Sequence, residues 1–390
     1  MGLREYLAHT ECGRVHTPAY YFDADEFEKR VRFVKEEFTD IPLTFSIKAN
    51  PFLLNNLPEG ISHVEVCSPG ELAICKAYHI PGSRIIYSGV NKGSDDVGDA
   101  VAYGVDIATA ESLLHVELEQ QAAEQEGIRQ KVLLRLTSGN QFGMSEDDIL
   151  QVLGHLNRYP NLIVHGIHYY SGTQKRKRQI DRDFADLRGA LSRFEREAGY
   201  VPQLVEMGPG LPADYFDPPY DETEKATLRE NKNQILAFAR EYPLGIEMGR
   251  YLAAPCGTYA SRVVDIKNNS DTDYVICDGG IHHLNYYGQT MAMQVPEMDV
   301  LQDHAGAQKP YCICGSLCTG ADVLVREVDL PELCRGDVLL FHRCGAYSVT
   351  ESRMLFLSRM MPEIYVYSED RGMEKLRGPV DSSWINRRDT

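Results

Sequence analysis

Polar side chains that can do chemistry follow several short hydrophobic runs of this sequence. Lys48 stands in SIKAN, Glu71 in CSPGE and Glu247 in EMGR. A lysine amine can attack a carbonyl carbon and form a covalent bond, and a carboxylate can stabilise a positive charge beside it. The turns in HYYSGTQ and MGPG contain glycine, so their exposed backbone N–H groups could hold a phosphate. Each feature also has an ordinary structural explanation, so their meaning depends on whether the fold brings them together.

Strand-like runs and helix-like segments alternate through the first two thirds of the chain. We expect strands at 44–48, 63–66, 84–88, 105–109, 132–136, 163–168, 203–207 and 244–247. Helical periodicity predicts helices at 69–79, 94–103, 111–126, 147–157 and 180–198. Eight such units within about 230 residues are typical of a closed (β/α)8 TIM barrel. A doubly wound open sheet is the alternative, but no GxGxxG follows the first strand.

The pattern changes at about residue 257. Strand-like runs at 258–266, 274–277, 337–341 and 363–367 follow one another with few helices between them. Turns are expected at Asn268-Asn269 and Arg335-Gly336. These features predict an antiparallel β domain after the barrel. We therefore assign residues 23–256 to the barrel, and residues 1–22 together with 257–390 to the C-terminal β domain.

A TIM barrel carries its active site at the carboxyl ends of its strands. In this sequence those ends bring a lysine, a glutamate, an arginine, a histidine and two glycine turns to one face: Lys48, Glu247, Arg135, His168 and the turns at 172 and 208–210. One shared binding site explains all of these residues more simply than a separate structural role for each. The strand ends therefore indicate a phosphate-bearing cofactor that is bound through a Schiff-base lysine.

Composition and charge exclude several functions. The 390 residues carry a net charge of −17, which argues against general binding to nucleic acid or to anionic membranes. No apolar run reaches the roughly 18 residues of a membrane span. The first residues include acids and have no apolar core, so we expect no secretory signal and a cytoplasmic protein.

The ten cysteines are expected to be reduced thiols rather than a disulfide framework. The tightest cluster is Cys312, Cys314 and Cys318, but no fourth zinc ligand follows at a finger-like spacing. His282 and His283 would point to opposite faces if they lay in a strand. We therefore expect no metal site.

Eight motifs between residues 44 and 347 occur in the order found in one known family: SIKAN, CSPGEL, ATAES, HYYSGTQ, MGPG, EMGR, CGSLCTGAD and GAY. In these motifs the chain resembles the pyridoxal-phosphate decarboxylases that share the alanine-racemase-like barrel, such as the diaminopimelate, ornithine and arginine decarboxylases. The resemblance implies pyridoxal 5'-phosphate as cofactor. It also implies a homodimer in which the C-terminal domain completes the active site of the partner.

The resemblance also implies roles for individual residues. Lys48 is similar to the lysine that binds the cofactor, and Glu247 to the acid that pairs with its ring nitrogen, which favours decarboxylation over racemisation. Cys318 is similar to the cysteine that protonates the product in the partner's site. The remaining cofactor positions are His168, Tyr170, Gly172, Thr173, Gly208, Gly210, Arg250 and Tyr347, and the substrate positions are Arg135, Asp278, Thr319 and Asp322.

Three departures from the family pattern concern the ring and the substrate. Tyr170 replaces the usual histidine, and its aromatic face can still stack on a ring. Thr319 follows Cys318 where relatives have a carboxylate that holds a distal ammonium group, and GGIHHLNYYGQ lacks the arginine that binds a distal carboxylate. We therefore expect a conjugated amino acid, of the kind found in siderophore or other secondary metabolism, or one carried on an acyl carrier protein. The basic run 175–178 is a candidate surface for such a carrier.

Three other functions remain open. The first is decarboxylation of diaminopimelate or of another free diamino acid. The second is an amino-acid racemase or epimerase on the same barrel, against which Glu247 argues. The third is an inactive regulatory homologue, although such relatives lose cofactor residues that this chain keeps.

Overall fold

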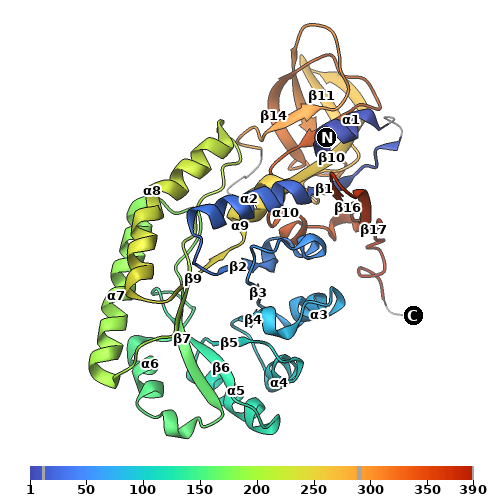
Figure 1. Cartoon of the computed structure of the whole chain (residues 1–390). Helices are drawn as coiled ribbons and strands as arrows, with labels where there is room; N and C mark the ends of the chain where they lie inside the picture. The colour runs from blue at the N-terminus through green and yellow to red at the C-terminus, as the bar shows by residue number, and fades with distance from the viewer. Residues whose placement is uncertain (11–13, 288–291, 389–390) are drawn as a thin grey trace. The chain divides into compact units, whose positions relative to one another are not determined.

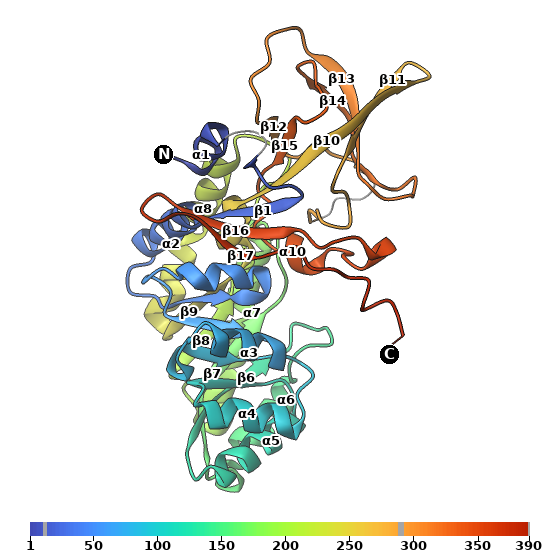
Figure 2. The same ribbon diagram turned by 90° about the vertical axis from the view of Figure 1, so that its right-hand side faces the viewer.

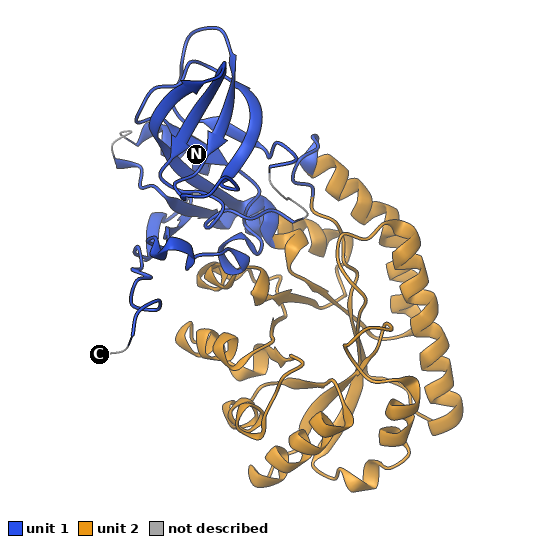
Figure 3. Ribbon diagram, turned by 180° about the vertical axis from the view of Figure 1, so that it is seen from behind, with its two compact units in different colours: residues 1–29, 214–220, 253–390 blue, residues 30–213, 221–252 orange. Residues whose placement is uncertain are grey.

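The computed structural model describes residues 1–10, 14–287 and 292–388. The chain divides into two compact units, which Figure 3 shows in different colours. Unit 1 comprises Met1–Lys29, Asp214–Tyr220 and Ala253–Thr390, and unit 2 comprises Arg30–Ala213 and Asp221–Leu252.

Unit 2 contains a closed barrel of parallel strands (Figure 1). In chain order they are β2 (Leu43–Ser46), β3 (His63–Val66), β4 (Ile85–Tyr87), β5 (Ile107–Ala110), β6 (Gln130–Leu136), β7 (Leu162–Tyr170), β8 (Leu204–Gly208) and β9 (Leu244–Met248). The last strand pairs with the first, with Leu43 opposite Ile246, and this pairing closes the sheet. The predicted barrel is therefore confirmed, and the open doubly wound sheet is wrong.

Helices connect the barrel strands: α3 (Pro69–Ala77), α4 (Ser94–Tyr103), α5 (Leu113–Gln125), α6 (Glu146–Leu153), α7 (Lys177–Ala198) and α8 (Tyr220–Glu241). Three of them begin at a serine whose hydroxyl accepts a backbone N–H of the first turn, namely Ser68, Ser112 and Ser145. The predicted helix at 147–157 is too long, because α6 ends at Leu153 and only a 3-10 turn, Leu156–Arg158, follows. Helix α8 and the earlier α2 (Ala24–Glu37) were not predicted.

Unit 1 is built on a second sheet, of strands β1 (Ala19–Asp23), β10 (Gly257–Asn269), β11 (Thr272–Cys277), β12 (Met298–Val300), β13 (Lys309–Cys314), β14 (Val323–Leu330), β15 (Val338–Phe341), β16 (Glu363–Ser368) and β17 (Gly372–Arg377). Two short helices, α1 (Leu3–His9) and α10 (Ser348–Glu351), belong to the same unit. The predicted β domain is present, but the sheet is mixed rather than antiparallel. β1 pairs with β16 in parallel, and β11 pairs with β13 in parallel. Both pairs join segments separated by long connections, which is what parallel neighbours require.

The first hairpin of this sheet corrects a predicted turn. Figure 2 shows β10 and β11 side by side as a long hairpin. Asn268 and Asn269, predicted as a turn, are paired within it, with Asp273 and Thr272 respectively. The turn lies at Ser270 and Asp271, which have φ angles of 50° and 65°. Two positive φ values in a two-residue loop match the twist of the flanking strands.

Candidate active site

Lys48 lies in a cluster of polar side chains at the carboxyl ends of the barrel strands. It belongs to a 3-10 turn, Ile47–Ala49, directly after β2. Its Nζ atom is 2.6 Å from Oε2 of Glu65 and 3.8 Å from Oε1 of Glu247. The thiol of Cys67 lies 3.4 Å from the same nitrogen and donates to Oε1 of Glu65 at 3.0 Å. The predicted lysine and glutamate are thus brought together, and Glu65 and Cys67 join them.

Glu247 is held as a buried carboxylate. Burial alone would raise its pKa, but the Lys48 ammonium group, His168 and Ser46 together hold that pKa well below its usual range. Ser46 donates to Oε1 at 2.7 Å, and Nε2 of His168 lies 3.1 Å from Oε2. An ionised carboxylate in this position can stabilise a positive charge on a bound group.

The glycine turns after β7 and β8 meet each other. A Cβ atom on Gly210, where φ is +63°, would lie 2.2 Å from the carbonyl oxygen of Gly172. The two turns are also joined by a hydrogen bond of 2.9 Å from the backbone N–H of Lys175 to the carbonyl of Gly210. Gly172 has a φ of +131° and open space where its Cβ would be. The positive φ angles and the close approach at Gly210 therefore favour glycine at both positions, and the space beside Gly172 is open.

Tyr170 and Arg250 border these turns. Tyr170 is the last residue of β7, and burial raises the pKa of its phenol. Its ring packs so closely on the next strand that a Cβ on Gly208 would lie 2.5 Å from it. Arg250 is buried at the start of α9 (Arg250–Ala253), immediately after β9, and Thr173 is half-buried in the turn after β7.

Arg135 lies at the end of β6, as expected, but it has partners inside unit 2. Its Nη1 atom donates to a carboxylate oxygen of Glu111, and its guanidinium group lies 4.8 Å from the ring centroid of Phe142. The second oxygen of Glu111 accepts the backbone N–H of Gly143 at 3.0 Å. The arginine charge is thus balanced within unit 2.

The basic run 175–178 does not form the exposed patch that the sequence predicts. Lys175 is buried, and its Nζ atom is 2.6 Å from Oδ2 of Asp183. Lys177 pairs with Asp181 at 2.6 Å, one helical turn away. Only Arg176 and Arg178 of this run are exposed. The prediction fails because α7 places acids beside both lysines.

In unit 1, Cys318 and Thr319 lie in the loop between β13 and β14. Cys318 is exposed and Thr319 is half-buried. Asp322, at the end of this loop, is buried, and its carboxylate accepts backbone N–H groups from Ile281 at 2.8 Å and Leu317 at 2.7 Å. Asp322 therefore fixes the loop that carries the cysteine.

Two further predicted residues lie in unit 1. The carboxylate of Asp278 accepts three hydrogen bonds, from Thr17 Oγ1 at 2.7 Å, Ser261 Oγ at 2.8 Å and the backbone N–H of Arg262 at 2.8 Å. Tyr347 is half-buried and precedes α10 with a φ of +65°. Hydrogen bonds to β10 and to Thr17 therefore fix the Asp278 side chain, and the start of α10 fixes the position of Tyr347.

His282 and His283 lie in a turn, so the premise that they occupy a strand was wrong. Their rings are 3.8 Å apart between centroids. Among the residues described, no group of three or more His, Cys, Asp or Glu side chains could hold a metal ion. Every cysteine in the described ranges is a free thiol. Within these ranges, no helix is both long and apolar enough to cross a membrane.

One known family matches most of the chain. The model described as "Pyridoxal-dependent decarboxylase, C-terminal sheet domain" matches residues 21–345, and the chain therefore belongs to the pyridoxal-dependent decarboxylases. A crystal structure of diaminopimelate decarboxylase from M. jannaschii covers all of this chain and 94% of its own at a TM-score of 0.84 and 20% identity, which shows the shared fold.

Two relatives are named for conjugated substrates. L-glutamyl-[BtrI acyl-carrier protein] decarboxylase of Niallia circulans is 28% identical over 90% of this chain and 88% of its own. The 2-[(L-alanin-3-ylcarbamoyl)methyl]-2-hydroxybutanedioate decarboxylase of Staphylococcus aureus is 25% identical over 89% of this chain and 93% of its own. Diaminopimelate decarboxylases of several bacteria also match, at identities from 24% to 29%.

The chain is therefore a pyridoxal 5'-phosphate-dependent amino-acid decarboxylase, a carboxy-lyase. The donor set of the barrel fits this cofactor. It offers an amine for the aldehyde at Lys48 and an ionised carboxylate for the ring nitrogen at Glu247. It also offers the glycine turns at Gly172 and Gly210, with open space where a Cβ of Gly172 would lie.

Glu206 is a buried acid that sequence reasoning missed. It lies on β8, and burial, together with the nearby Glu247 and Glu65 charges, raises its pKa from 4.5 to about 8. A Cβ on Gly245 would lie 2.1 Å from its Oε2 atom, so this glycine makes room for the carboxyl group. Within this barrel, Glu206 is thus protonated at pH 7 while Glu247 is ionised.

We expect Glu206→Gln to remove a pH-dependent loss of stability. Between pH 4.5 and about 8 the folded chain holds a proton that the unfolded chain has released, so stability falls as the pH rises through this range. The loss is on the order of a few kcal/mol, at about 1.4 kcal/mol per pKa unit. We expect the thermal midpoint of the variant holoenzyme to rise relative to that of the wild type as the pH increases from 5 to 9. Parallel curves would contradict the assignment, and Glu124→Gln, exposed on α5, is the control.

Proposed function

We propose that this enzyme removes the α-carboxylate of an amino acid whose distal end is joined to another group through a neutral amide or thioester. The observation that carries the proposal is the loop after β13. Thr319 is neutral, and Asp322 is buried with each of its oxygens bound to a backbone N–H, so this loop presents no exposed carboxylate to a distal ammonium group. Losing such an ionic hydrogen bond costs about 1.5–3 kcal/mol. The two relatives named for conjugated substrates support the same reading.

In the proposed site, Lys48 holds the cofactor and Glu247 balances the positive charge of its ring nitrogen. The cofactor, when bound, withdraws electrons from the substrate α-carbon, so that the carboxylate leaves as carbon dioxide. We assign the phosphate to Gly172, Thr173, Gly208, Gly210, Arg250 and Tyr347, with Tyr170 and His168 beside the ring. The hydrogen bond between His168 and Glu247 supports this arrangement, because it orients the carboxylate.

Cys318 then donates its thiol proton to the α-carbon, in a site contributed by two subunits of a homodimer. Its exposure supports this role, because a residue that acts on another subunit must lie at the surface of its own. We place Asp278, Thr319, Asp322 and Arg135 at or near the substrate on the motifs that contain them. We also propose that the enzyme works in the cytoplasm, with neither nucleic acid nor membrane as partner, and that an acyl carrier protein is one candidate donor.

Decarboxylation of a free diamino acid is the second candidate, because diaminopimelate decarboxylases match at 24% to 29% identity. Membership of the decarboxylase family, with a glutamate at position 247, speaks against a racemase or an inactive homologue.

Carbon dioxide release by the cofactor-loaded enzyme separates the two candidates. Free diaminopimelate, ornithine, lysine, arginine and glutamate are compared with γ-glutamyl amides, each with either configuration at the α-carbon. We expect kcat/KM for a γ-glutamyl amide to exceed that for every free amino acid by at least about tenfold. Efficient turnover of one free diamino acid would refute the conjugate proposal, since another residue would then have to bind the distal amine.

A further inference from the structure

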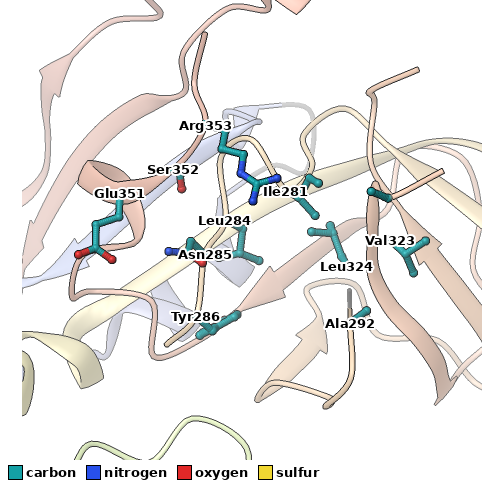
Figure 4. Close-up of a pocket in the computed structure, with 11 residues that line it drawn as sticks. Ile281, Leu284, Asn285, Tyr286, Ala292, Val323, Leu324, Glu351, Ser352 and Arg353 are labelled. Carbon is teal, nitrogen blue, oxygen red and sulfur yellow. The ribbon is translucent and has the colours of Figure 1, made fainter. Parts of the chain in front are cut away.

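A pocket of about 250 Å³ lies within unit 1 (Figure 4). Its walls are about equally polar and apolar. Ile281 and Leu284 contribute apolar groups, and Asn285, Glu351 and Arg353 contribute polar or charged groups. At about 30 Å³ for each water-sized group, it has room for about eight such groups. Pockets for whole small-molecule ligands are usually larger, at roughly 300–1,000 Å³. The size therefore suits one substituent of a substrate.

The pocket lies between the two segments of unit 1 that carry the proposed site residues. On one side, Ala321 lines it from the loop that holds Cys318, and Asp322 ties this loop to Ile281. On the other side, it is lined by Arg353, which follows α10 and therefore lies a few residues after Tyr347. Ala321 and Arg353 thus link the pocket, along the chain, to the segments that carry Cys318 and Tyr347.

Two charged side chains line the pocket, those of Glu351 and Arg353. In the described part of the chain the guanidinium group of Arg353 has no ion-pair partner, and it is exposed. Figure 4 shows it directed toward Ile281 and Leu284, while the carboxylate of Glu351 points away from them. A guanidinium group beside apolar walls binds a carboxylate through two parallel hydrogen bonds.

We propose that this pocket receives the distal group of the substrate and that Arg353 pairs with a carboxylate on that group. The inference rests on the proposed function, since a free diamino acid has no substituent beyond its distal amine or carboxylate. It makes Arg353 a specificity-determining residue for anionic conjugates.

Two γ-glutamyl compounds test the pairing. γ-Glutamylglycine and γ-glutamylethylamide carry the same amide and differ only in a terminal carboxylate or methyl group. We expect the wild-type holoenzyme to favour γ-glutamylglycine by about 10- to 100-fold in kcat/KM for carbon dioxide release. Arg353→Gln should abolish this preference by slowing γ-glutamylglycine alone, and Arg353→Lys should keep part of it. Arg359→Gln is the matched control, because Arg359 is exposed in the same segment but does not line the pocket.

Equal turnover of the two compounds by the wild type, or a preference that survives in Arg353→Gln, would overturn the inference and leave the conjugate decarboxylase intact. Failure of the proposed function has a different signature, namely that neither compound exceeds the free diamino acids. In that case, calorimetry measures the binding of each compound to the holoenzyme and tests the role of Arg353 without turnover. Tighter binding of γ-glutamylglycine that Arg353→Gln removes would support it, and equal binding would refute it.

Discussion

Lys48→Ala is expected to abolish decarboxylation and the visible absorbance band of the lysine-bound cofactor. The side chain lies 2.6 Å from Glu65 and 3.8 Å from Glu247, at the point where the ends of the barrel strands meet. No other amine is placed beside Glu247 by the contacts of the described residues. We expect kcat to fall by at least about 10³-fold. Absorbance spectra and carbon dioxide release measure the two effects on the same samples.

Lys48→Arg is the matched control for charge. Arginine can keep an ion pair with Glu65, but it cannot form the covalent bond to the cofactor. We therefore expect this variant to lose the band and the activity as fully as the alanine variant. A band that persists in Lys48→Ala would show that another lysine binds the cofactor, and activity in Lys48→Arg would show that the charge alone suffices.

Cys318→Ala is expected to slow turnover by about 10²- to 10⁴-fold, the usual contribution of a positioned proton donor. The cofactor band should persist, because Cys318 lies in unit 1 whereas the proposed cofactor lysine lies in unit 2. Cys334→Ala is the control, since Cys334 is also an exposed thiol of unit 1. Unchanged turnover in Cys318→Ala would remove this residue from the mechanism.

Mixing Lys48→Ala and Cys318→Ala proteins tests whether a site is shared between subunits. With free subunit exchange, half of the dimers are hybrids, and each hybrid has one site in which both residues are intact. About a quarter of the wild-type activity should therefore return. Subunit exchange must first be verified. If no activity then returns, the whole site lies within one chain.

The barrel was predictable from the sequence because each unit carries its own local signals. Strand-like runs, helical periodicity and a serine such as Ser68 or Ser112 at a helix start act over a few residues. Helix α8 escaped prediction because two residues of its buried face, Glu224 and Asn231, are polar. They interrupt the apolar periodicity of Leu228, Ile235 and Phe238. The parallel pairs of unit 1 escaped because they join segments far apart in the chain.

The same distinction applies to the site. The motifs that contain Lys48, Glu247 and the glycine turns indicate the roles of these residues. A closed barrel then brings the carboxyl ends of its strands together. Glu65 and Glu206 are single acids within hydrophobic strands. The residues next to them in the sequence do not indicate that Glu65 forms an ion pair whereas Glu206 is buried and neutral.

By itself, the sequence determined the barrel, because strand and helix signals act over a few residues. It also indicated the cofactor and the class of reaction, through motifs that resemble those of a known family. Only the tertiary structure decided how the charges are distributed: Glu65 pairs with Lys48, Glu206 stays protonated, and Lys175 is neutralised by Asp183. The physical reason is that ion pairing and burial depend on distances between residues on different strands and helices. An electrostatic interaction changes over a few ångströms, and such distances arise only when the chain is folded.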